Sequence, residues 1–210
     1  MVPIFIAELT DKDALLLLSL ATRVKPWVVF AAGSVAFTIT SAIIVTVGYF
    51  LVSFLPVFLI SLAGGLVMIA YGTWSFFEAN KEEEEFTKAE RKLKLQASKG
   101  LLLVFLNAVS LLIVLDLAGD ATEVLTILFV ARFQNTLLVF VGAVVALIAA
   151  TAVETMIGNR LSKILSAKRI RIFSLLVFLT IGSVAILTAY SISEAQTGFD
   201  LFFAVPNVPG

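Results

Sequence analysis

Long apolar stretches constrain this chain more than any other feature of its sequence. Six stretches consist mainly of aliphatic residues and phenylalanine, and each approaches or exceeds the roughly 20 residues that a helix needs to cross a bilayer. They occupy residues 2–22, 27–50, 56–77, 100–131, 136–158 and 171–191. Charged residues make up only 14% of the chain and the mean hydropathy is +1.06, whereas soluble domains carry about 25% charged residues. The sequence predicts an all-α integral membrane protein with six transmembrane helices.

The fourth stretch is too long for one straight span. It contains Gly119, and a glycine weakens a helix because it has no side chain to restrict the backbone. We expect this stretch either to begin as an interfacial helix or to break near Gly119.

The basic residues predict the orientation of the helices. Except for Lys12 and Arg132, all lysines and arginines follow the first, third or fifth stretch, and an excess of basic residues marks the cytoplasmic side. Both termini are therefore predicted to be extracytoplasmic. The first stretch contains acids and has no basic residues before it, so it does not resemble a cleaved signal peptide. Short loops and the lack of a targeting segment favour the plasma membrane of a prokaryote.

An internal repeat divides the chain into two halves. Asp11 and Arg23 recur 109 positions later as Asp120 and Arg132. The glycines continue the match, Gly33 with Gly142 and, after one inserted residue, Gly48 with Gly158 and Gly72 with Gly182. Three spans in each half would insert the halves in opposite directions, as in many secondary transporters whose site lies at mid-bilayer. We predict inverted three-helix repeats at 1–77 and 100–191, a charged cytoplasmic linker at 78–99, in helical conformation, and a C-terminal tail at 192–210.

The composition limits the chemistry of any site. The chain contains no cysteine and no histidine, which excludes thiolate or imidazole metal ligands and nucleophiles. A bound metal must therefore be held by oxygen atoms. We expect no cofactor, since the metal would be the transported substrate, and no enzymatic activity.

Two groups of acids interrupt the apolar stretches. Asp116, Asp120 and Glu123 follow i, i+4, i+7 spacing, which would place all three carboxylates on one face of a continuous helix. In the first half, Glu8, Asp11 and Lys12 would share a face, with Asp13 directed elsewhere. Buried ionised groups are costly in a membrane and normally mark a pathway.

The two groups together suggest a cation site. Asp11 and Asp120, brought together across the pseudo-two-fold axis, would form a cage of oxygens with Thr10, Thr122 and freed backbone carbonyls. Hard divalent cations prefer such oxygen ligands. Neighbouring carboxylates repel one another, so part of the group should hold protons when no cation is bound. We predict a site that holds either the cation or protons. Its predicted cation ligands are Glu8, Asp11, Asp116, Asp120 and Glu123, of which all but Glu123 are expected to contact the metal directly.

Several other polar residues have two open interpretations. Lys12 could act as an internal substitute cation or could pair with an acid so that the first helix inserts. Glu154, in the fifth stretch, could line the cavity or extend to the cytoplasmic surface near Arg160. Thr38, Thr40 and Ser41 in the second stretch are predicted to form hydrogen bonds within or between helices.

The acidic segments resemble a known family motif. Glu8-Leu9-Thr10-Asp11-Lys12-Asp13 and Ala118-Gly119-Asp120-Ala121-Thr122 are similar to the twin Glu-x-Gly-Asp-Lys-Thr/Ser motifs of the calcium/manganese–proton exchanger family, grouped with the lysine-exporter superfamily. The resemblance implies six spans in two inverted repeats, one site formed by both motifs, and exchange of Mn2+ or Ca2+ for protons. Glu8, Asp11, Lys12, Asp120 and Thr122 match the motif.

Four positions depart from the family motif. Thr10 and Asp13 replace the first glycine and the first hydroxyl residue, and Leu117 and Ala121 stand where the second glutamate and lysine are expected. Asp116 and Glu123 are candidates to compensate.

Three other functions would account for parts of this sequence. An exporter of an amino acid or other organic cation could share the inverted-repeat fold. Gly119-Asp120 also resembles part of an intramembrane aspartyl protease motif, but the partner Tyr-Asp pair is absent. A membrane scaffold would leave the buried acids unexplained. The expected partners are the divalent cation, protons and the lipid bilayer, without nucleic acid, and the sequence leaves a homodimer open.

Overall fold

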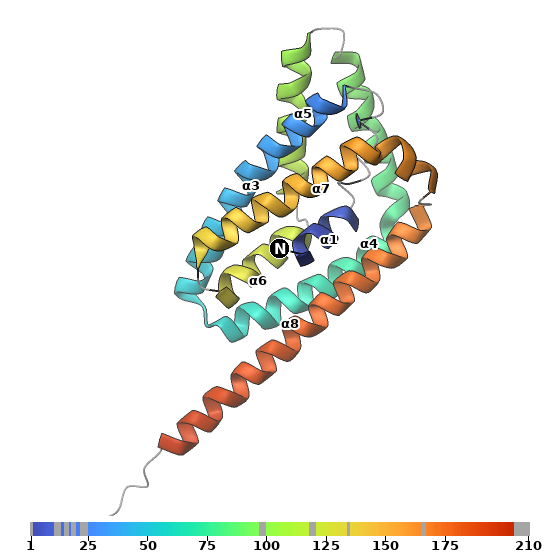
Figure 1. Cartoon of the computed structure of the whole chain (residues 1–210). Coiled ribbons are helices and arrows are strands. Elements are labelled where there is room, and N and C mark those ends of the chain that lie inside the picture. Colours follow the sequence, from blue (N-terminus) through green and yellow to red (C-terminus); the bar gives the residue numbers. More distant parts are fainter. Residues whose placement is uncertain are drawn as a thin grey trace, which may run out of the picture.

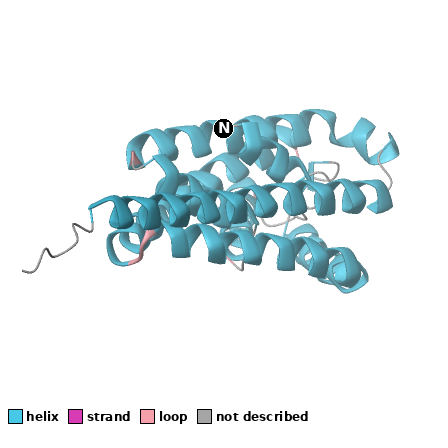
Figure 2. Cartoon of the chain, turned by 90° about the horizontal axis from the view of Figure 1, so that it is seen from below, coloured by secondary structure: helices cyan, strands magenta, loops and turns pink. Residues whose placement is uncertain are grey.

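The computed structural model describes the backbone of residues 2–10, 14, 17, 20–21, 25–96, 100–117, 121–133, 135–164 and 167–203. Side chains are described for these residues except 10, 78–96, 101, 157–164, 167–171 and 194–203. All secondary structure in this part of the chain is helical (Figure 2). The helices are α1 (Val2–Thr10), α3 (Pro26–Phe54), α4 (Val57–Gln96), α5 (Leu101–Asp116), α6 (Ala121–Phe133), α7 (Thr136–Ile164) and α8 (Ala167–Phe203). The prediction of an all-α protein is confirmed.

Four described helical segments are long and apolar enough to cross a membrane: Pro26–Phe54, Val57–Phe77, Thr136–Met156 and Ile172–Ser193. Helices α5 and α6 add a fifth span if the pair counts as one segment. The two helices are bent by 65° relative to each other, so this span would be a broken one. The predicted break near Gly119 is confirmed, since α5 ends at Asp116 and α6 begins at Ala121. The first predicted span lies partly outside the described residues, and its described helix, α1, has nine residues.

Prolines set both ends of α3. Pro26 occupies the first turn, where its missing N–H costs nothing because the first N–H groups of a helix have no intrahelical partner. At the other end Leu55 is extended, with φ −119° and ψ 139°. That conformation follows from Pro56, since a residue before proline is disfavoured in the α region. A short connection therefore returns the chain directly into α4.

Helices α4 and α8 form the most extensive pair in the described structure (Figure 1). Their backbones approach each other closely at two glycines. A Cβ atom added to Gly65 would lie 2.8 Å from the carbonyl oxygen of Gly182, and one added to Gly182 would lie 2.7 Å from the carbonyl oxygen of Gly65. Small residues allow such approach, and van der Waals contact then holds the helices together within lipid.

The remaining helices pack against this pair and against one another. Helix α3 lies along α7, and α5 packs against α3 and, less extensively, α4. Helix α1 packs against α7 and α8, and it runs alongside α7 in Figure 1. One hydrophobic core joins these elements and includes Ile4 of α1, Phe37 of α3, Met68 of α4, Leu112 of α5 and Phe178 of α8.

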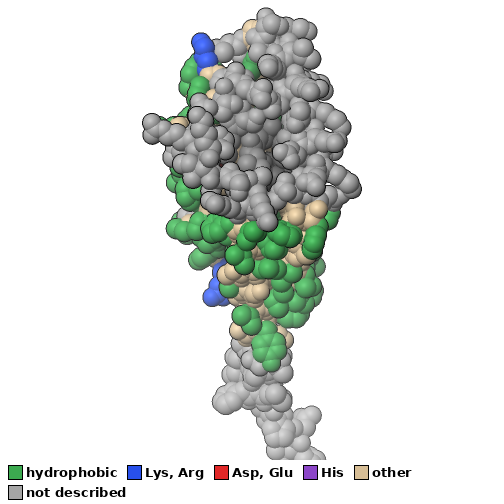
Figure 3. Space-filling model, turned by 90° about the vertical axis from the view of Figure 1, so that its right-hand side faces the viewer, with side chains coloured by type: hydrophobic (Ala, Val, Ile, Leu, Met, Phe, Trp, Pro, Cys, Tyr) green, Lys and Arg blue, Asp and Glu red, His purple; other side chains and the backbone are tan. Residues whose placement is uncertain are grey.

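Apolar side chains also cover much of the outer surface, as the described part of the face in Figure 3 shows. On α3 the exposed side chains include Val35, Ile39, Ile43 and Val47, which recur at every fourth residue. A stripe of this kind would be unfavourable in water, but in a bilayer it faces lipid chains. The structure therefore has apolar residues on the inside and the outside of the bundle.

Two helices extend beyond their membrane segments. Helix α4 continues through the predicted linker to Gln96, which confirms that most of this charged stretch is helical. Helix α8 continues into the predicted C-terminal tail as far as Phe203.

Candidate cation site

Acidic residues lie at the end of α5 and in the first turn of α6. Asp116 is the last residue of α5, and the backbone N–H of Leu117 still donates to the carbonyl oxygen of Ile113 at 3.0 Å. Glu123 lies in the first turn of α6. The last carbonyl groups of a helix lack intrahelical partners and carry partial negative charge, so this end of α5 favours a cation.

The break corrects the prediction that Asp116, Asp120 and Glu123 share one helical face. That face requires an unbroken helix, whereas Asp116 and Glu123 belong to two helices whose axes differ by 65°. Asp120 lies outside the described residues.

Three acidic side chains are buried on three different helices. Glu8 on α1 and Glu154 on α7 have no exposed surface, and Asp116 on α5 is 3% exposed. Glu154 therefore lies within the protein, which excludes the interpretation that it extends to the cytoplasmic surface. Buried carboxylates in a membrane must be neutralised by protons, by cations or by other charged groups.

Buried hydroxyl groups accompany the acids. Thr122 on α6 is 3% exposed, and Thr151 and Thr155 stand one turn apart beside Glu154. Thr151 donates its hydroxyl to the carbonyl oxygen of Leu147 at 2.8 Å, and Thr155 donates to that of Thr151 at 2.7 Å. A hydroxyl that donates its proton in this way keeps oxygen lone pairs that can contact a cation.

The first half of the bundle carries a hydroxyl, on Ser41 of α3, for which the sequence predicted only a hydrogen bond within or between helices. Thr38 and Thr40 donate to backbone carbonyls of α3 as predicted, but the buried oxygen of Ser41 has no hydrogen-bond partner among the described residues. At the offset of 110 that relates Gly48 to Gly158, Ser41 corresponds to Thr151. The repeat offset was thus the signal that could have drawn attention to Ser41.

Comparison with known protein families identifies the family to which this chain belongs. The family model described as "Divalent cation/proton antiporter GDT1" matches residues 1–83 and 104–193. The chain belongs to the GDT1 family. The match includes both acidic segments, and it confirms the resemblance found in the sequence. Searches of curated proteins and of solved structures gave no significant match.

Membership of the GDT1 family establishes the broad class of the protein. The family is one of divalent cation/proton antiporters, and the apolar helices agree with an integral membrane transporter. The cation is therefore a substrate of the protein, not a cofactor.

The predicted site residues of this GDT1 family member are described only in part. Side chains are described for Glu8, Asp116, Thr122, Glu123 and Glu154, whereas Thr10 is described as the last residue of α1 by its backbone alone. Asp11, Lys12, Asp13 and Asp120 lie outside the described residues. Within the described residues, no group of three or more acids is close enough to hold one metal ion. Two of the four predicted direct metal ligands, Asp11 and Asp120, are not included in that search.

Proposed function

We propose that this protein exchanges Mn2+ or Ca2+ for protons, with the cation held where the two acidic segments meet near mid-bilayer. The observation that carries the proposal is the broken α5–α6 segment, with buried Asp116 on one side and buried Thr122 on the other, in a chain of the GDT1 family. Broken helices commonly form ion sites in transporters because their ends expose backbone carbonyls at membrane depth.

The proposed ligands combine both halves of the chain. Glu8 and Asp11 would contribute from the first segment, and Asp116, Asp120 and Glu123 from the second. The polar groups proposed to assist are Thr10, Lys12, Asp13, Thr122 and Glu154. Such a set offers only oxygen atoms and one ammonium group, and its carboxylates suit Mn2+ or Ca2+.

The packing supports an inverted repeat. Helix α1 contacts α7 and α8, and α5, its counterpart in the second half, contacts α3 and α4. The equivalent helices α3 and α7 pair with each other, as do α4 and α8. We propose that residues 1–77 and 100–191 form the two repeats, joined by the linker at 78–99 and followed by the tail at 192–210.

Exchange follows from the burial of the acids. An empty site with several ionised carboxylates would be strongly disfavoured inside the bundle, so protons would occupy it. A divalent cation that enters can replace those protons, because either species neutralises the same oxygens. Cation movement in one direction is then coupled to proton movement in the other.

The orientation and cellular location remain part of the proposal. We propose that both termini lie outside the cytoplasm, because the basic residues follow the first, third and fifth predicted spans. We further propose that the protein lies in the plasma membrane of a prokaryote and exports the cation. The protein could act as a monomer or as a homodimer.

Flux through purified protein in liposomes tests the proposal. A pH-sensitive dye inside the liposomes should report proton movement when Mn2+ or Ca2+ is added outside. Asp120→Asn should abolish this signal, whereas the matched substitution Asp200→Asn, near the end of α8, should leave it intact. Unchanged flux in a correctly folded Asp120→Asn variant would contradict the proposed site. A signal driven by lysine in place of a metal would favour the organic-cation exporter.

A further inference from the structure

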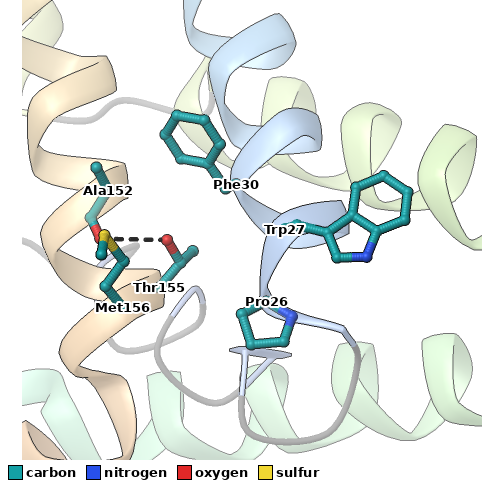
Figure 4. A pocket seen from close by; sticks show the side chains of 6 residues that line it. All are labelled: Pro26, Trp27, Phe30, Ala152, Thr155 and Met156. Carbon is teal, nitrogen blue, oxygen red and sulfur yellow. Dashed lines mark hydrogen bonds between the residues drawn. The ribbon is translucent and has the colours of Figure 1, made fainter.

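A groove lies between the first turns of α3 and the end of the membrane segment of α7. It encloses about 240 Å3 and is lined by Pro26, Trp27, Phe30, Ala152, Thr155 and Met156. Figure 4 shows Phe30 directed across the groove towards α7, with Thr155 on the opposite wall. The hydroxyl of Thr155 is used within α7, since it donates to the carbonyl oxygens of Thr151 and Ala152 at 2.7 and 3.3 Å. The accessible lining is consequently apolar.

The groove opens to the outer surface of the bundle. Trp27 is 59% exposed and Met156 is 84% exposed. Ala152 and Met156 share one face of α7 because they are four residues apart, whereas Glu154 points to the other side and is fully buried. The groove therefore faces the surroundings of the protein, while the acid of the same helical turn faces the interior.

One basic side chain, that of Lys25, stands next to the α3 end of this apolar groove. Lys25 is exposed and stands immediately before the first turn of α3. Arg23 precedes it in the sequence, and α7 continues beyond Met156 through Arg160 and Lys163. Tryptophan together with lysine and arginine at the end of a span is typical of the headgroup level of a membrane. The N-terminus of α3 adds partial positive charge at the same level.

We propose that this groove binds an anionic phospholipid, with part of one acyl chain against Phe30, Ala152 and Met156 and the phosphate beside Lys25. Its volume is smaller than the roughly 300–1,000 Å3 of sites that enclose a whole small molecule, so it suits a segment of a chain. Its apolar lining provides no groups to recognise a polar ligand, whereas the ammonium group of Lys25 at one end complements a phosphate. The bound lipid would contact α3 and α7 together.

Fluorescence quenching can test the lipid site directly. The chain has two tryptophans, so Trp74→Phe leaves Trp27 as the only tryptophan, whose emission can be excited selectively over that of tyrosine. The protein is reconstituted with phosphatidylglycerol or phosphatidylcholine brominated in the acyl chains at equal mole fraction. We expect brominated phosphatidylglycerol to quench Trp27 with a roughly fivefold preference, the factor that one basic residue at a membrane surface provides. Lys25→Gln in the same background should remove most of that preference.

A matched pair of substitutions on α7 tests the acyl-chain part of the site. Ala152→Phe would fill the groove and should reduce quenching of Trp27 by both lipids. Val145→Phe, at a position that is 59% exposed on the same helix but outside the groove, should leave quenching unchanged. Circular dichroism and the melting temperature confirm that both variants fold.

Three outcomes would overturn the proposal. Equal quenching by the two lipids would show that Trp27 merely lies at the membrane interface. Unchanged quenching in folded Ala152→Phe would show that no chain enters the groove. A change in oligomeric mass caused by Ala152→Phe would show that a second copy of the protein covers this face.

Discussion

Among individual residues, three buried acidic side chains are the most informative about function. Glu8 and Glu154 are completely buried and Asp116 nearly so, in a chain whose lipid-facing surface is apolar. Each ionised carboxylate costs about 2.5–3.5 kcal/mol at the centre of a membrane helix on insertion scales, so evolution retains such groups where they serve a pathway. The three acids lie on helices α1, α5 and α7, and α1 packs directly against α7.

Asp116→Asn should abolish stabilisation of the protein by Mn2+ or Ca2+. A ligand present at 100 times its dissociation constant stabilises the native protein by about 2.7 kcal/mol, which raises the melting temperature. The variant lacks the charged oxygen at the end of α5, so its melting temperature should no longer respond to the metal. Thermal unfolding in detergent measures this, with Asp200→Asn as the control. An undiminished metal response in Asp116→Asn would exclude this residue from the site.

Glu154→Gln should slow cation-driven proton flux without unfolding the protein. Groups that support metal ligands typically change affinity or activity about 10- to 100-fold when they are substituted. The same reduction is expected here, because glutamine has the size of glutamate but cannot carry negative charge. Glu83→Gln makes the identical chemical change in the charged extension of α4 and should have no effect. Equal flux in both variants would assign Glu154 a purely structural role.

Lower pH should weaken metal binding. The proposed ligands must lose their protons to hold a divalent cation, so protons compete with the metal for the same oxygens. The rise in melting temperature caused by Mn2+ should therefore become smaller as the pH falls. A rise that is independent of pH would be inconsistent with exchange at one shared site.

Glycines allow close contact between the helices of the two main pairs, α3 with α7 and α4 with α8. A Cβ atom at Gly33 of α3 would lie 2.8 Å from the Cγ2 methyl of Thr151 on α7. At Gly65 of α4 the obstacle is different, because an added Cβ would meet the backbone oxygen of Gly182 at 2.8 Å. A methyl group can be removed by substitution, whereas a backbone oxygen cannot.

Gly33→Ala should destabilise the protein, and Thr151→Ser should rescue it. Overpacking of this kind typically costs about 1–3 kcal/mol. Serine lacks the methyl group that would clash and retains the hydroxyl that donates to Leu147. The double variant should therefore melt at a higher temperature than Gly33→Ala alone. A double variant with the summed loss of both single changes would show that the contact between α3 and α7 differs from that in the structure.

The arrangement of the whole molecule depends on how the halves insert into the membrane. The chain has no cysteine, so single cysteines can be introduced without background. Ser53 is exposed near the end of α3, and Ser98 lies in the predicted cytoplasmic linker.

On intact cells, an impermeant thiol reagent should label Ser53→Cys and should not label Ser98→Cys. The reason is that the basic residues around the linker favour the cytoplasmic side. Permeabilised cells provide the control, because both positions should then react. Labelling of Ser98→Cys but not Ser53→Cys on intact cells would reverse the proposed orientation of the molecule.

The sequence determined the class of this protein because the relevant signals are local. Continuous apolar stretches require a membrane or a buried core, and a break near Gly119 was one of the two alternatives that the overlong stretch predicted. The acidic segments were also sufficient to indicate the family. These features depend on neighbouring residues and need no knowledge of how distant helices meet.

Only the tertiary structure decided which surfaces of the helices face inward. Lipid-facing and core-facing residues are both apolar here, so hydrophobic periodicity says little about the direction of a given face. The structure placed Glu154 in the interior and paired α3 with α7 and α4 with α8. Those outcomes depend on contacts between segments that lie far apart in the chain, and the close approach of Gly65 to Gly182 is one of the contacts that fix them.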